Sequence, residues 1–103
     1  MSEAFGFVEI VGVTAAIDAV DLMAKSADVH LLSWERKLGG RLVTLIIGGD
    51  VSAVQAAVDA ACTKGIKKPV LHAVIAQPHE EIVKMVERSM SRWRTTGDYP
   101  WRM

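Results

Sequence analysis

The stretch that decides the fold reads VHLLSW (residues 29–34) and then KLGGRLVTLII (residues 37–47). Both halves are rich in Leu, Val and Ile, which favours strands over residues 28–36 and 41–47. Between them, Gly39 and Gly40 tolerate positive φ angles, so residues 37–40 predict a tight connection, most simply a hairpin. We therefore expect two antiparallel neighbours near the middle of the chain.

On each side of this hairpin the sequence predicts a strand and helices. Towards the N-terminus, residues 5–10 predict a strand, and apolar spacings of three and four predict a helix over residues 13–27. The apolar stripe of that helix is Val13, Ile17, Val20, Ala24 and Ala27. Towards the C-terminus, the predicted elements are a helix over 51–64, a strand over 70–75 and a helix over 79–92. The order β-α-β-β-α-β is that of the ferredoxin-like α+β fold, with an antiparallel sheet, both crossover helices on one face, and a C-terminal helix and short tail added.

Composition limits the organisation and the partners of the chain. Its 103 residues allow one domain, which we divide into a main domain (residues 1–92) and a tail (residues 93–103). Lys plus Arg equals Asp plus Glu, 12 each, so the net charge is zero and gives no long-range attraction to nucleic acid or to anionic membranes. No targeting or transmembrane segment is recognised, and we expect a cytoplasmic protein without nucleic-acid or membrane partners.

No pattern in the sequence predicts catalysis, a metal site or a cofactor. His30, His72 and His79 are isolated from one another, and none has a second ligand at metal spacing. The single cysteine, Cys62, lies within a predicted helix beside its apolar stripe, where a packed small side chain is the usual role. We therefore predict that the protein is not an enzyme.

Six fragments, in the right order, resemble the bacterial microcompartment shell proteins of the single-domain, hexamer-forming type (BMC domain). The resemblance covers about residues 3–87. The fragments are EAFGFVE (3–9), GVTAAIDA (12–19), MAKSADV (23–29), LVT (42–44), GDVSAV (49–54) and QPH (77–79). It implies a structural subunit in the shell of a cytoplasmic microcompartment, where homohexameric tiles pack edge to edge with other shell proteins around encapsulated enzymes.

The resemblance also assigns residues to the tile edge. Lys25 matches the edge lysine of the family, which donates to backbone carbonyls of the next hexamer, and Pro78 and His79 match the last two residues of an R-P-H motif near that edge. Gln77 replaces the arginine of that motif, so it loses the charge and the bidentate fork. The edge set implied by the resemblance is therefore Lys25, Gln77, Pro78 and His79.

The loop between the second and third predicted strands matches the loop that lines the central pore in the family. Here it contains Lys37, Leu38, Gly39, Gly40 and Arg41, and it is one residue longer than the K-I-G-S-G pattern. Lys37 and Arg41 would make the opening basic and favour small anionic metabolites, whereas Leu38 would obstruct part of it. Considered alone, the same residues also fit a solvated hairpin turn.

Several alternatives remain open. The tail interleaves Trp93, Tyr99 and Trp101 with arginines, and we expect it to dock on its own or a neighbouring subunit rather than to bind nucleic acid. Cargo contact is a further possibility for the tail. For the whole protein, the alternative function is a small ferredoxin-like regulatory domain that binds a ligand between subunits, and a third hypothesis is a small enzyme that uses His72 or His79.

Overall fold

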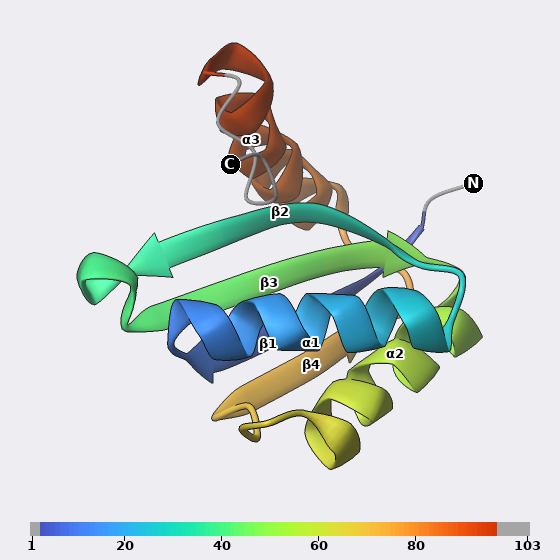
Figure 1. Ribbon diagram of the computed structural model, residues 1–103. Helices are drawn as coiled ribbons and strands as arrows, with labels where there is room; N and C mark the ends of the chain where they lie inside the picture. The colour runs from blue at the N-terminus through green and yellow to red at the C-terminus, as the bar shows by residue number, and fades with distance from the viewer. Residues whose placement is uncertain (1–2, 97–103) are drawn as a thin grey trace.

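The computed structural model describes residues 3–96, and its elements follow the predicted order (Figure 1). They are β1 (Ala4–Val11), α1 (Val13–Ser26), β2 (His30–Lys37), the 3-10 turn η1 (Leu38–Gly40), β3 (Leu42–Gly49), α2 (Val51–Lys64), β4 (Leu71–Ile75) and α3 (Glu80–Thr96). Helix α3 continues across the predicted boundary between residues 92 and 93. Residues 97–103 of the predicted tail lie outside the described part of the chain.

The four strands form one antiparallel sheet in the order β2-β3-β1-β4. This order places β3 between β1 and β2, the two strands joined by α1, which is the split β-α-β arrangement. Figure 1 shows α1 and α2 side by side on one face of the sheet and α3 on the other. The predicted ferredoxin-like α+β fold is therefore confirmed, and the third helix adds a partial layer on the opposite face.

The main core lies between the sheet and α1 with α2, and it depends on small residues. Ala16 and Ala19 are completely buried, whereas Ile17 is 48% exposed. The predicted stripe is wrong at Ile17 and Ala24, which are exposed, whereas its other members Val13, Val20 and Ala27 pack against the core. The most deeply buried face of α1 is its alanine face, because small side chains let the two helices and the sheet approach closely. Gly6 of β1 serves the same purpose, since a Cβ there would lie 2.8 Å from Val54 Cγ1 of α2.

A second, smaller core lies under α3. Its buried members are Phe5 of β1, Ile46 of β3 and Val86 of α3. Phe5 and Phe7 stack edge to face, with ring centroids 6.4 Å apart. Helix α3 makes most of its contacts with β2, so the half of this face formed by β1 and β4 is less covered.

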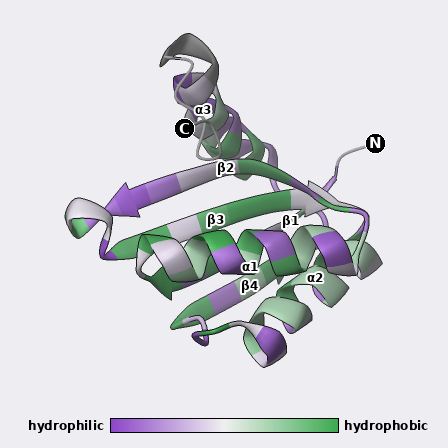
Figure 2. Ribbon diagram, viewed as in Figure 1, coloured by the Kyte–Doolittle hydropathy of each residue, from purple (hydrophilic) through white to green (hydrophobic). Residues whose placement is uncertain are grey.

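Strand β4 forms one edge of the sheet and carries exposed apolar side chains (Figure 2). The strand is hydrophobic along most of its length. Leu71 is 67% exposed, and the neighbouring Val70 and Ile66 are 53% and 69% exposed. An uncovered apolar edge strand invites pairing or packing with another chain, and soluble proteins rarely leave one unprotected.

Candidate functional site

The η1 turn has an unusual backbone. Leu38, Gly39 and Gly40 all adopt positive φ angles, of 55°, 66° and 90°. The Arg41 N–H donates a hydrogen bond of 3.3 Å to the Leu38 carbonyl and closes the turn. Glycine adopts this conformation at no steric cost, but Leu38 does so against its own Cβ. The predicted tight connection is confirmed, and the backbone of Leu38, the first residue of η1, is strained.

The turn projects its side chains outwards while its backbone is held to the domain. Leu38 is 73% exposed, and Lys37 and Arg41 on either side are also exposed. The Arg41 carbonyl accepts a 2.9 Å hydrogen bond from the N–H of Gly12, at the start of α1. Two cationic side chains and one apolar side chain therefore lie at the tip of a fixed hairpin.

Lys25 lies on the last turn of α1. Its Nζ lies 2.8 Å from Asp21 Oδ2 one turn earlier, and both side chains are exposed. The hydrogen bond from Lys25 to Asp21, together with the charge of that carboxylate, raises the pKa of Lys25. The position is also electrostatically favourable, because a cation near the C-terminus of a helix is attracted to the negative end of the helix dipole.

The other three residues of the predicted edge set form the connection between β4 and α3. Gln77 and His79 are exposed, whereas Pro78 is buried. His79 Nδ1 accepts a 3.1 Å hydrogen bond from the Glu81 N–H, and its carbonyl accepts the N–H of Ile82 at 2.8 Å. His79 therefore caps α3, a structural role that the sequence reasoning did not assign to it.

The strand register places the loop and the edge set at opposite ends of the sheet (Figure 1). Ala4, Gly49, His30 and Ile75 lie at one end, close to the residues that precede β2 and follow β4. Lys25 and residues 77–79 belong to that end. Lys37 and Leu42, which flank η1, lie at the other end, about 25 Å away for eight residues of strand. The predicted loop residues and edge residues therefore form two separate groups.

Many of the exposed large apolar side chains lie towards the loop end of the domain. They are Ile66, Val70 and Leu71 before and at the start of β4, Leu38 in η1 and Ile17 in α1, and the N–H of Ile66 donates a 3.0 Å hydrogen bond to Asp18 Oδ2 of α1. The sequence reasoning missed this feature and assigned Ile17 to the core. Apolar side chains of this size exposed at one end of a domain are typical of surfaces that contact other proteins.

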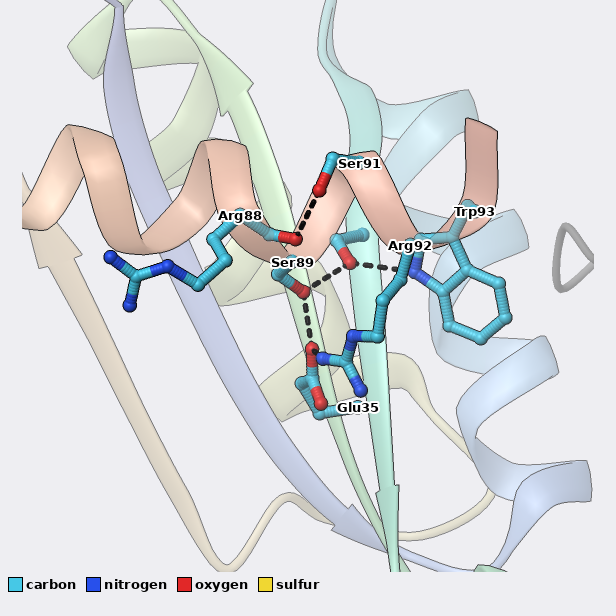
Figure 3. Close-up of polar contacts among 7 residues, drawn as sticks. Glu35, Arg88, Ser89, Ser91, Arg92 and Trp93 are labelled. Carbon is cyan, nitrogen blue, oxygen red and sulfur yellow. Dashed lines mark hydrogen bonds and ion pairs between the residues drawn. The ribbon is translucent and has the colours of Figure 1, made fainter. Parts of the chain in front are cut away.

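A polar cluster fastens α3 to β2 (Figure 3). The Trp93 indole N–H donates to Ser33 Oγ at 2.8 Å, and Ser33 Oγ lies 2.5 Å from Ser89 Oγ. Ser89 Oγ in turn donates to Glu35, which also accepts from Arg92. Because Ser89 gives its only proton to Glu35, Ser33 must donate to Ser89. All donors therefore run in one direction towards the carboxylate.

The carboxylate at the end of this cluster is electrostatically stabilised. Desolvation acts to raise the pKa of Glu35, but the hydrogen bonds from Arg92 and Ser89 and the charges of Arg92 and Lys37 outweigh it and lower the pKa. Trp93 also contacts Trp34 edge to face, with ring centroids 6.3 Å apart. Trp93, the first residue of the predicted tail, is thus part of α3 and docks on its own subunit, one of the two expected surfaces.

The remaining candidates for chemistry lie apart from one another. Within residues 3–96, no three His, Cys, Asp or Glu side chains are placed to hold a metal ion. His30 Nε2 lies 3.0 Å from Glu3 Oε2, and His72 is exposed on β4. Burial, with a contribution from Asp59, raises the pKa of the Cys62 thiol, which disfavours the nucleophilic thiolate.

None of the helices in the described part of the chain is both long and apolar enough to cross a bilayer.

The protein is therefore a small split β-α-β domain. An exposed basic hairpin lies at one end of its sheet, and Lys25 with residues 77–79 lies at the other end. The family model for the BMC domain matches residues 4–78. The chain belongs to the BMC-domain family of microcompartment shell proteins, and the shell of a microcompartment, within the cytoplasm, is its expected place.

Named relatives agree over most of the chain. It is 45% identical to the bacterial microcompartment shell protein PduA of Salmonella typhimurium over 92 residues, covering 87% of this chain and 97% of that protein. It is 37% identical to the shell protein EutK of Escherichia coli, covering 94% of this chain and 54% of that protein. These relatives are named as shell proteins rather than as enzymes, which is consistent with a structural subunit.

A solved structure shares the fold. The crystal structure of a microcompartments protein from Desulfitobacterium hafniense DCB superposes with a TM-score of 0.71 at 28% identity, over 86% of this chain. The chain spans about half of that protein, 49% of its length. The matched half of that protein therefore has the same topology as the domain described above.

Proposed function

We propose that the protein forms homohexameric tiles of a microcompartment shell, with the η1 loops of six copies around a central pore for small metabolites. The observation that supports this best is the separation of the two groups of residues. The loop lies at one end of the sheet and Lys25 with residues 77–79 at the other. A wedge with this layout, repeated around a sixfold axis, places the loop at the centre and the edge set at the rim.

The exposed apolar flanks supply the interface that such a ring requires. In a closed cyclic ring, one surface of each subunit packs against a different surface of the next, and the same contact repeats. The flank at β4, with Ile66, Val70 and Leu71, and the flank at β2 and η1, with Leu38, lie at opposite edges of the sheet, as this pairing demands. Burial of these side chains between neighbours would remove the uncovered apolar edge of β4.

Six hairpin tips around one axis would form a basic opening. Each copy contributes the exposed Lys37 and Arg41, and positive charges grouped in this way raise the local concentration of anions. Leu38, at 73% exposed, would narrow the same opening with an apolar side chain. We therefore propose small anionic metabolites as the molecules that cross it.

The rim is proposed to join the tile to its other partners. Lys25 and His79 are exposed there. Beside its contact with Asp21, the Lys25 ammonium has further N–H groups that can donate to carbonyl groups of a neighbouring tile, which can belong to the same or another shell protein. Gln77 can donate and accept hydrogen bonds in that contact but carries no charge. Such tiles would enclose the enzymes of the compartment.

The oligomeric state tests the proposal directly. Native mass spectrometry and sedimentation of the purified chain should give a hexamer, and Leu71→Asp should dissociate it by placing a charge in the apolar flank. Val51→Asp is the matched control, because Val51 is also an exposed apolar residue but is the first residue of α2, at the end of the domain away from the loop. A stable dimer or trimer would contradict the ring and favour a regulatory domain with a ligand between subunits. A hexamer insensitive to Leu71→Asp would show that the flank is wrongly assigned.

A further inference from the structure

A groove runs between α3 and the uncovered part of the sheet, on the face opposite α1 and α2. Its volume is about 700 Å³. Its floor and walls are mostly apolar and include Phe7, Ile46, Ile75, Met85 and Val86. Met85 is 59% exposed there, and Phe7 and Ile75 are half-buried. The groove is therefore an apolar surface that the described residues leave uncovered.

We propose that the segment following α3, residues 97–103, folds back and covers this groove of its own subunit. The segment reads GDYPWRM and brings two aromatic side chains, Tyr99 and Trp101. Aromatic rings are the side chains that gain most from burial in such a groove. Gly97 directly follows the last residue of α3, and glycine at this position commonly lets the chain reverse its direction.

The geometry allows the segment to reach the groove. Arg88, on the groove wall, lies eight residues before Thr96, so it is about 12 Å back along the helix axis. Seven extended residues span about 23 Å, enough to turn and run past Arg88 to Met85. Because the segment is tethered beside the groove, its effective concentration is in the millimolar range, which favours it over a free partner of modest affinity.

Charge supports the same occupant. Arg88 makes no ion pair with any of residues 3–96, although it lies on the groove wall. Asp98, two residues after Thr96, brings a carboxylate to the C-terminal part of this wall, which is cationic through Arg88 and Arg92. Trp93 already follows the same pattern, since its indole docks on Ser33 and Trp34 of its own subunit.

Photo-crosslinking tests the proposal on the full chain. The aromatic photo-crosslinker p-benzoylphenylalanine replaces Trp101, and the products are mapped by mass spectrometry in a mixture of unlabelled and ¹⁵N-labelled chains. We expect crosslinks to Phe7, Ile75 or Met85 within the same chain. The same crosslinker at Ile66, an exposed position near the start of β4, should not reach the groove. Crosslinks to the groove of another copy, or none to the groove, would overturn the proposal.

Oxidation footprinting supplies a second, independent readout. If the segment covers the groove, Met85 should oxidise several-fold faster in the Tyr99→Ala/Trp101→Ala variant than in the parent, while the buried Met23 stays protected in both. Both substitutions lie outside residues 3–96, so every described core contact is kept and the fold should be retained. Equal rates of Met85 oxidation in parent and variant would show that residues 97–103 do not cover this surface.

Discussion

Leu38 has a backbone conformation that is sterically unfavourable for a residue with a side chain. In the described part of the chain it is the one non-glycine residue with a positive φ, 55°. Its side chain is 73% exposed, so the packing of its own subunit does not compensate the strain. The surrounding hairpin therefore holds Leu38 in this conformation. Strain of this kind is typical of positions whose side chain serves a function, here an exposed leucine at the loop tip.

Relief of this strain should be measurable as stability. Asparagine tolerates the left-handed conformation better than alanine does, and both substitutions remove the apolar methyl groups of the exposed leucine. We expect the Leu38→Asn variant to have a free energy of unfolding about 1 kcal/mol higher than the Leu38→Ala variant. Urea denaturation at a fixed protein concentration measures the difference. Equal midpoints for the two variants would mean that the backbone at residue 38 is not strained.

At the scale of elements, the contact between β2 and α3 shows what sequence patterns could not predict. Regular alternation along β2 would place Ser33 on the α1 side and Trp34 on the α3 side. A bulge between Leu31 and Ser33 shifts the register, so Trp34 enters the main core and Ser33 meets Ser89 of α3. The elements and their order were predictable because apolar periodicity defines them. The polar cluster was not, because it joins residues 54 to 60 positions apart through that bulge.

The same limit applies to α1 and to the loop. Periodicity predicted the helix and only part of its buried face. It gave weight to large apolar residues, whereas the close packing here buries Ala16 and Ala19 most deeply and leaves Ile17 exposed. Gly39 and Gly40 predicted the tight turn correctly. They carried no information about Leu38, whose φ is imposed by its neighbours.

Protonation of Glu35 should loosen α3. Its pKa is lowered in the folded protein, so the stability that it contributes is present above the unfolded pKa and is lost as the pH falls through the lower, folded value. We expect Glu35→Gln to cost about 1 kcal/mol at pH 7 and to lose less stability than the parent when the pH is lowered below about 4. Urea midpoints between pH 7 and pH 3 measure both effects.

Glu87→Gln serves as the control for that experiment. Glu87 is exposed on the same helix and makes no ion pair with the residues that the structure describes. Its substitution should leave the stability at pH 7 unchanged. If Glu35→Gln and Glu87→Gln behave alike across the pH range, the carboxylate does not fasten α3 to β2.

The hairpin element also sets the expected selectivity of the pore. Replacement of both Lys37 and Arg41 by glutamate reverses the charge of six loops at once and should reverse the anion preference of flux through reconstituted tiles. The preference in the parent should weaken as salt is raised, because the charges are exposed. Replacement by glutamine is the matched control and should abolish the preference without reversing it. An unchanged preference in the glutamate variant would exclude a basic pore rim.

At the scale of the whole molecule, the separation of the two ends predicts that ring formation and tiling can be altered independently. Lys25 lies about 25 Å from the loop end, so Lys25→Asp should leave the hexamer intact and prevent its assembly into sheets, because a carboxylate would face carbonyl oxygens of the next tile. Lys84→Asp is the control, since Lys84 is also exposed and also pairs with a carboxylate one turn away.

Gln77→Arg should act in the opposite direction to Lys25→Asp and strengthen the assembly of hexamers into sheets, because it restores a charged donor at the same rim. Electron microscopy of sheets, with native mass spectrometry of the hexamers, measures both effects. Sheets of Lys25→Asp that match the parent would place the tile edge elsewhere on the molecule.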